Sequence, residues 1–188
     1  KKSKEVNISS YLKPGIGFGG SCLPKDLEGI VNLGKKLKVK NNIFDVVDKI
    51  NKNQSTIISN LILKILRMNK INKILFLGYS FKENTDDFRN SPTLEIVERI
   101  KKNKFSIYMH DFVLKSKKMK DYHKKYPNIH FIDDWNKYVS NNILIIPIHK
   151  DIRYSKLKNN IKLKYIFDPK NLYNKKDFLH CAYYDICF

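Results

Sequence analysis

The chain has 188 residues, of which 42% are hydrophobic and 12% aromatic, a composition of folded globular proteins that excludes a disordered polypeptide. No apolar run approaches the length of a membrane span, so we expect no membrane partner. The formal net charge is +19, but the basic residues are nearly all lysines scattered along the sequence, and no nucleic-acid-binding motif accompanies them. We therefore expect a solvated, lysine-rich surface and no nucleic-acid partner.

Three widely spaced cysteines, Cys22, Cys181 and Cys187, argue against a disulfide framework and against a zinc site. This cysteine usage predicts a reducing, cytoplasmic compartment. The sequence opens at Lys1 with neither a methionine nor a signal peptide, and we expect it to be a fragment of a longer protein.

The first informative stretch is residues 17–26, GFGGSCLPKD. Pro24 suits the first turn of a helix, and apolar residues at helical spacing follow it, so we predict a helix over residues 24–38. Cys22 then lies just before a helix N-terminus, where free N–H groups favour a thiolate over a thiol.

The residues around Cys22 strengthen this interpretation. Lys25 adds a positive charge nearby, and Gly19 and Gly20 leave room for a ligand to approach their backbone N–H groups. A buried structural cysteine beside a flexible loop is the alternative, but the surroundings favour a reactive thiol.

A long amphipathic pattern follows over residues 43–68 and predicts one helix. Its apolar residues fall mostly on one face: Phe44, Val47, Ile50, Ile57, Ile58, Leu61, Ile62, Ile65 and Leu66. A helix longer than average often forms an interface, although the pattern alone fits a plain buried helix equally well.

From Lys73 onward short apolar segments alternate with helical ones, which predicts an α/β fold with a doubly wound parallel sheet. The predicted strands have the sequences KILFLG, FSIYMHD, HFI, NILIIPI and YIFD; one helix opens at Ser91 and Pro92 and a second lies near Trp135. Ligands of such sheets bind at the carboxyl ends of the strands, where we expect the polar loop after KILFLG, His110, Asp111 and Asp168.

This sheet lacks the glycine fingerprint of a dinucleotide-binding domain. The residues after KILFLG are YSFKEN rather than G-x-G-x-x-G, and no strand leads into the earlier GFGGSC. We therefore expect the chain to bind no NAD on its own.

Residues 17–26 resemble the cysteine signature of the UDP-glucose/GDP-mannose 6-dehydrogenases. Residues 78–92, GYSFKENTDDFRNSP, resemble the G-x-x-F-K-x-x-T-D-D-x-R-x-S-P loop of the same family, in the same order along the chain. The resemblance covers nearly the whole chain but corresponds only to the C-terminal part of a family member. It implies a catalytic-cysteine loop and central helical dimerisation segment at 1–71 and a Rossmann-like nucleotide-sugar-binding α/β domain at 72–188. It also implies a homodimer through the central helix and a missing N-terminal NAD-binding half.

The resemblance also implies a reaction, in which the C6 alcohol of a nucleotide sugar becomes a uronic acid with two NAD. Cys22 would be the nucleophile that holds the intermediate aldehyde as a thiohemiacetal and then as a thioester. Asp26, one helical turn later, would position or deprotonate the attacking water. From the pattern alone, Asp26 is equally well an acidic residue favoured by a helix N-terminus.

Two cations, Lys25 and Arg89, match residues that contact NAD in the family, and Lys82 matches a lysine that contacts the substrate. Without the resemblance, all three would be interpreted as exposed surface cations. Asp86 and Asp87 are interpreted as loop-capping or arginine-orienting carboxylates, and no metal site is expected.

The segment before the glycines favours the GDP-mannose branch slightly. Tyr11, Lys13, Ile16 and Gly19 match substrate contacts there, although Lys13 replaces the usual Arg and loses bidentate phosphate binding. Conversely, Lys170 stands in a segment similar to the D-x-R-N of the UDP-glucose branch. A non-catalytic nucleotide-sugar-binding or dimerisation module is the alternative function, and a nucleic-acid-binding protein is a third.

Overall fold

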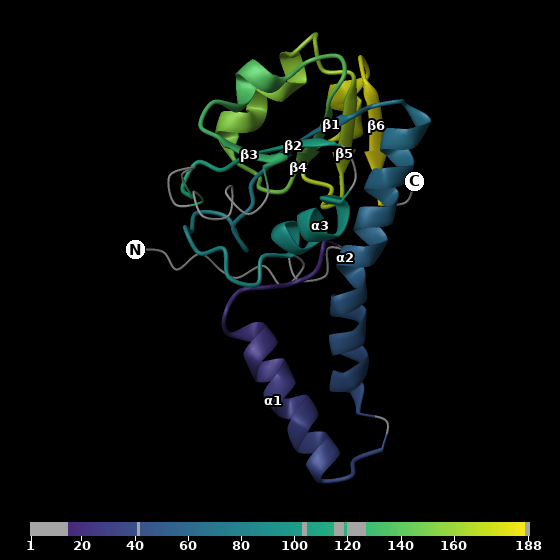
Figure 1. The fold of residues 1–188 in the computed structure, drawn as a ribbon, viewed down its shortest axis with the longest axis vertical. Coiled ribbons are helices and arrows are strands. Elements are labelled where there is room, and N and C mark those ends of the chain that lie inside the picture. Colours follow the sequence, from purple (N-terminus) through teal and green to yellow (C-terminus); the bar gives the residue numbers. More distant parts are fainter. Residues whose placement is uncertain (1–14, 41, 103–104, 115–118, 120–126, 187–188) are drawn as a thin grey trace.

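A two-helix arm leads into an α/β body (Figure 1). The computed structural model describes residues 15–40, 42–102, 105–114, 119 and 127–186, and the account below concerns these. Among them, six strands form one parallel sheet in the order β3-β2-β1-β4-β5-β6, with helices on both faces. The predicted fold class is confirmed.

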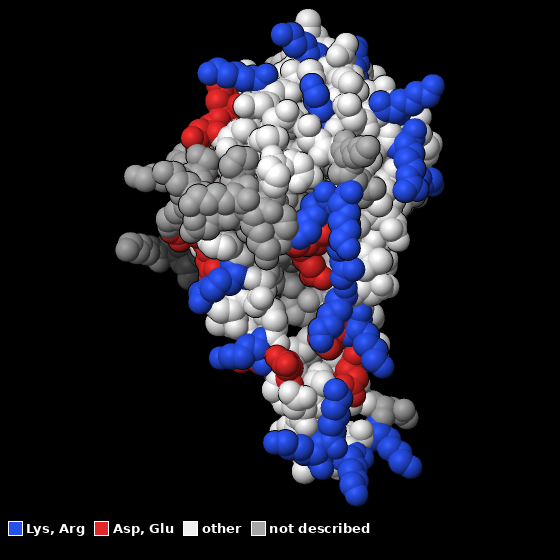
Figure 2. All heavy atoms as spheres, viewed as in Figure 1, with Lys and Arg blue, Asp and Glu red and all other residues white. Residues whose placement is uncertain are grey.

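The arm consists of α1 (Leu23–Lys36) and the first half of α2 (Ile43–Met68), close to the predicted bounds. Asn42 caps α2, because its side chain accepts a hydrogen bond from the N–H of Phe44 at 3.0 Å. Figure 2 shows Lys and Arg spread over the visible face, with a group at the free end of the arm. This agrees with the expected solvated, lysine-rich surface.

The apolar face predicted along α2 divides in two. The second half packs on the sheet, with Ile58, Ile62 and Ile65 almost fully buried. The first half is exposed, as is Ile57 just beyond it, and α1 also exposes apolar residues. We call this surface the arm patch; it comprises Leu23, Ile30, Leu33, Leu37, Val39, Ile43, Phe44, Val46, Val47, Ile50 and Ile57. The division follows from geometry, because α2 is longer than the sheet that it covers.

The strands are β1 (Lys73–Leu77), β2 (Ser106–His110), β3 (Ile129–Ile132), β4 (Leu144–Pro147), β5 (Tyr165–Asp168) and β6 (Ala182–Asp185). Five match predicted strands, and β6 was not predicted. Its side chains are all half-buried, and among the described strands it pairs only with β5, so it lacks the apolar run that marks the central strands.

Alternation along β1 divides the core between two faces of the sheet. Ile74 and Phe76 face the cluster covered by α2 and by α3 (Pro92–Ile100), whereas Leu75 and Leu77 face the opposite cluster. That second cluster is covered by three 3₁₀ helices: η3 (Trp135–Tyr138), at the predicted helix near Trp135, η4 (Ile152–Asn159) and η5 (Lys175–Phe178). The predicted division at residue 71 stays a prediction, although α2 and the sheet share one core.

Candidate active site

Two loops meet where α1 joins the body: the cysteine loop (residues 15–22) and the strand-end loop after β1 (residues 78–92). The side chain of Asn90 donates a hydrogen bond to the carbonyl of Gly20 at 3.0 Å. A Cβ on Gly19 would lie 1.9 Å from the Asn90 carbonyl oxygen, and one on Gly20 would lie 2.7 Å from the Phe81 ring. The two resembling motifs, about 60 residues apart in sequence, are therefore packed directly against each other.

This packing gives the glycine pair a structural role as well. Protein atoms fill the space on the Cβ side of Gly19 and Gly20, while the approach of a ligand to their N–H groups stays a prediction. Gly20 also has φ of +86°, which a residue with a side chain rarely adopts. Glycine is required here because no side chain fits between the two loops.

Cys22 occupies the predicted position at the N-terminus of α1. It is the exposed N-cap residue, and its carbonyl accepts the N–H of Asp26 at 2.9 Å. Its Sγ lies 3.8 Å from the Ser21 hydroxyl. Burial raises the pKa of the Cys181 thiol to about 11. Cys187 lies outside the described residues.

Lys25 and Asp26 lie in the first turn of α1, next to Cys22. Their side chains form an ion pair of 3.5 Å, and both are well exposed. Such exposed pairs contribute little to stability, so the pairing leaves both groups available to a ligand.

Arg89 is held by a neighbouring carboxylate. Its Nε and Nη2 donate to Asp87 Oδ1 and Oδ2 at 3.0 and 2.7 Å, which lowers the pKa of Asp87 to about 2. The pKa of Arg89 is raised, mainly by the Asp87 hydrogen bond, with a smaller contribution from Cys22. Asp87 thus orients an arginine, as interpreted from the sequence, and Arg89 lies near enough to Cys22 to interact with it electrostatically.

The Lys82 Nζ lies 5.4 Å from the centre of the Phe81 ring, and the same ring lies against Gly20 of the cysteine loop. Ile16, another predicted substrate contact, is buried in the core, so its side chain fastens the loop to the body. Tyr11 and Lys13 lie outside the described residues.

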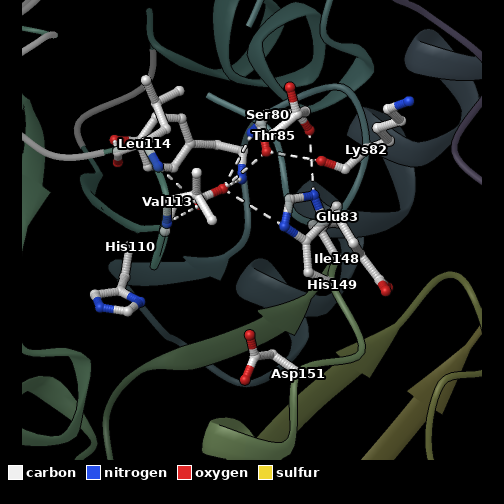
Figure 3. Close-up of polar contacts among 12 residues, drawn as sticks. Ser80, Lys82, Glu83, Thr85, His110, Val113, Leu114, Ile148, His149 and Asp151 are labelled. Atoms are coloured by element: carbon white, nitrogen blue, oxygen red, sulfur yellow. Dashed lines mark hydrogen bonds and ion pairs between the residues drawn. The ribbon is translucent and has the colours of Figure 1, made fainter. Parts of the chain in front are cut away.

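The carboxyl end of β1 is closed by the protein's own groups (Figure 3). The buried Asp111 carboxylate accepts the N–H groups of Tyr79 and Ser80 at 3.1 and 3.3 Å and the Ser80 hydroxyl at 3.0 Å. A buried imidazole, His149, lies 3.5 Å from the same carboxylate and contacts the Ser80 carbonyl at 3.2 Å through Nε2. Gly78 has φ of +101°, and a Cβ there would lie 2.3 Å from the His149 ring.

These contacts show what replaces the glycine fingerprint that is missing after β1. In dinucleotide-binding domains, the N–H groups after the first strand bind the pyrophosphate. Here the N–H groups of Tyr79 and Ser80 donate to Asp111 instead. The other two polar residues expected at this edge also form hydrogen bonds within the protein. His110 Nδ1 pairs with the Tyr154 hydroxyl at 2.8 Å, and Asp168 accepts a hydrogen bond from the Tyr183 hydroxyl at 2.8 Å.

A cavity of about 350 Å³ opens beside this cluster at the strand ends. Its walls combine both charges with aromatic rings, and Arg153 covers the Phe112 ring at 3.7 Å. The lining residues include Glu83, Asp111, Phe112, His149, Asp151 and Arg153.

Lys170, which the sequence indicates only as a replacement for arginine, lies close to the cysteine loop. It follows β5, and its Nζ donates to the carbonyl of Ile148 at 3.0 Å. Burial lowers the pKa of its ammonium group. Because its Cγ is 3.9 Å from the Cβ position of Gly15, it lies between the cysteine loop and the sheet edge.

The buried His149 predicts a loss of stability in acid. Burial lowers its pKa below 6.5, so the unfolded chain binds a proton more readily than the folded one. The free energy of unfolding should therefore decrease as pH falls below about 6.5. His149→Gln keeps a donor for the Ser80 carbonyl without titrating, and it should flatten this decrease in urea unfolding curves.

The exposed His180 provides the matched control. His180→Gln should leave the acid dependence as it is in the wild type. An equal acid dependence in wild type and His149→Gln would show that His149 is not responsible.

The described part of the chain contains no cluster of three or more His, Cys, Asp or Glu suited to a metal ion. Within the same residues, every helix is too short or too polar to cross a membrane.

Comparison with known proteins gives two matches to family models. Residues 75–175 match the UDP-binding domain of the UDP-glucose/GDP-mannose dehydrogenase family, and residues 2–53 match its central domain. The GDP-mannose 6-dehydrogenase of Pseudomonas savastanoi pv. phaseolicola is 28% identical over 166 residues, 84% of this chain and 37% of the relative. The UDP-glucose 6-dehydrogenase YwqF of Bacillus subtilis is 38% identical over 92 residues, 49% of this chain and 21% of the relative.

Solved structures of nucleotide-sugar dehydrogenases also match the fold of this chain. A ternary complex of GDP-mannose dehydrogenase from Pseudomonas aeruginosa matches with a TM-score of 0.78 and 25% identity, over 100% of this chain and 44% of that one. A UDP-glucose dehydrogenase from Pyrobaculum islandicum shares the fold, with a TM-score of 0.75 and 23% identity over 95% of this chain and 40% of that one. The chain thus matches less than half of the length of these proteins.

Proposed function

Because the chain belongs to the UDP-glucose/GDP-mannose dehydrogenase family, we propose that it is the C-terminal part of a nucleotide-sugar 6-dehydrogenase. The complete enzyme oxidises the C6 alcohol of GDP-mannose or UDP-glucose to the uronic acid with two NAD. The observation that carries this proposal is the contact between the two loops. It brings the loop that ends in the exposed Cys22, at a helix N-terminus, against the strand-end loop that carries Lys82 and Arg89.

The chemistry assigned to this chain centres on Cys22. NAD, when bound, accepts a hydride in each of the two oxidations. The Cys22 thiolate adds to the aldehyde carbon left by the first oxidation and forms a thiohemiacetal, whose oxidation leaves a thioester on Sγ. Water then attacks the thioester carbon, the C–S bond breaks, and the carboxylate leaves with the thiolate restored. Asp26 is one turn from Cys22 and exposed, so it is available to position that water.

The residues present fit NAD only in part. Arg89 and Lys25 are exposed cations beside Cys22, as a pyrophosphate contact requires. The sheet itself offers no pyrophosphate cradle, because Asp111 takes the N–H groups after β1. We therefore assign the main NAD contacts to the half that lies outside this chain.

Binding measurements test whether this chain binds the nucleotide sugar while NAD depends on the other half. By calorimetry, the chain should bind GDP-mannose or UDP-glucose weakly and NAD not at all, since Lys82 and the surrounding lysines favour the sugar donor while NAD lacks its cradle. Lys82→Ala should weaken nucleotide-sugar binding about tenfold or more, as expected for the loss of one charged hydrogen bond. Competition between the two sugars would identify the substrate branch.

The control is Lys162→Ala, an exposed lysine that precedes β5 at the opposite edge of the sheet. It should bind nucleotide sugars like the wild type. Micromolar NAD binding by this chain alone would contradict the assignment of its domain.

The proposed assembly is a homodimer that buries the arm patch. The arm patch exposes eleven large apolar residues on α1, on α2 and on the link between them, and contiguous exposed apolar patches mark interfaces. The partner surface would be the same patch on a second copy, as in a two-fold dimer.

A further inference from the structure

The cysteine loop is fastened to α2 by side-chain amides. Asn51 makes a two-point contact with Phe18: its Oδ1 accepts the Phe18 N–H at 2.8 Å, and its Nδ2 donates to the Phe18 carbonyl at 3.0 Å. One turn later, Gln54 donates to the carbonyl of Gly15 at 2.7 Å. These contacts join residues more than 30 positions apart in the sequence.

The loop is shaped to receive the Asn51 carboxamide. Gly17, next to Phe18, has φ of +100°, and a Cβ there would lie 2.9 Å from Asn51 Oδ1. A residue with a side chain at position 17 would be strained and would press on the amide. The fit therefore depends on both partners, the glycine and the asparagine.

The Asn51 anchor lies where α2 is firmly held. One turn on, the Ser55 hydroxyl donates to Glu95 of α3 at 2.8 Å and accepts from Arg99 at 2.9 Å. The next turn brings Ile58, which is almost fully buried. Asn51 therefore links the cysteine loop to a part of α2 that α3 and the core hold in place.

α1 offers no comparable support to Cys22. Only Val31 and Gly34 are buried along the whole helix, and both lie more than two turns from Cys22. The position of Cys22 relative to Arg89 is thus set by the loop that precedes it, through Asn51 on one side and Asn90 on the other.

We propose that Asn51 is a positioning residue for Cys22, holding the cysteine loop in the conformation that presents the thiol to the strand-end loop. The catalytic part of this inference rests on the proposed function of Cys22. Asn51 suits the task because a neutral amide supplies one donor and one acceptor, matching the N–H and C=O of Phe18.

Asn51→Asp provides a specific signature. The carboxylate still accepts the Phe18 N–H but faces the Phe18 carbonyl without a proton to donate. Protonation restores the donor, so the folded state should favour the acid and raise the pKa of this new carboxyl. Its stabilising contact should then be present at low pH and lost as pH rises.

The first measurement is hydrogen exchange of the Phe18 amide in this chain. Asn51→Ala should lower its protection about fivefold or more, as expected for loss of a hydrogen bond of about 1 kcal/mol. Asn51→Asp should resemble Asn51→Ala at pH 8 and approach wild type at pH 4 to 5, each compared at the same pH. Asn53 is exposed on the same helix, and Asn53→Ala and Asn53→Asp should match wild type at every pH.

The second measurement uses the longer protein with its NAD-binding half. Asn51→Ala should lower kcat about tenfold with KM changed less than twofold, since a displaced thiol affects the chemical steps more than substrate capture. Equal kcat values for Asn51→Ala and Asn53→Ala, or unchanged Phe18 protection in Asn51→Ala, would overturn the proposal. If wild type formed no uronate, the proposed function would fail, whereas the exchange result would still decide whether Asn51 holds the loop.

Discussion

Cys22→Ser, in the protein that includes the NAD-binding half, should lower uronic acid formation by about a thousandfold or more. A serine hydroxyl at this position adds to an aldehyde poorly and leaves no thioester for water to cleave. The first oxidation does not use the thiol, so a single turnover should yield one NADH per nucleotide sugar where the wild type yields two. Product analysis by mass spectrometry together with NADH absorbance measures both quantities.

Cys181→Ser is the matched control, because this half-buried thiol lies away from both loops and its pKa is about 11. It should leave the rate unchanged. In native buffer at neutral pH, iodoacetamide should also alkylate Cys22 faster than Cys181 or Cys187. Normal uronate production by Cys22→Ser would remove the proposed nucleophile, and equal alkylation of all three cysteines would remove the argument for an activated thiol.

Ile50→Asp should convert the proposed dimer into a monomer. Ile50 is 61% exposed in the single chain, so the change should not disturb the fold of the monomer. In a dimer, it would place an unpaired charge in an apolar interface at a cost of about 3–5 kcal/mol, which weakens association about a hundredfold or more. Light scattering at tens of micromolar measures the state directly.

Ile161→Asp is the control, since Ile161 is 82% exposed and lies outside the arm. It should remain dimeric. Leu61, which the sequence places on the same helical face, is a poor test because it packs half-buried on the core of its own chain. A wild-type monomer at these concentrations, or a dimeric Ile50→Asp variant, would refute an interface at the arm patch.

The sequence by itself determined the elements whose signals are local. A sustained apolar period over about Ile43 to Met68 predicted α2 at its observed bounds. Pro24 and the apolar residues after it placed Cys22 at a helix N-terminus. Apolar runs identified the central strands, which are buried on both faces, but not β6, whose half-buried edge position leaves no such run.

The tertiary structure decided what depends on residues distant in the sequence. Periodicity shows that α2 has an apolar face, but only packing shows that Ile58 meets the core while Ile50 meets solvent. Gly19 and Gly20 are needed because Asn90 and Phe81 pack against them. Asn51 is placed to bind the backbone N–H and carbonyl of Phe18. No local pattern encodes such contacts, because a side-chain amide or a missing Cβ acquires its function only from the backbone that folding brings against it.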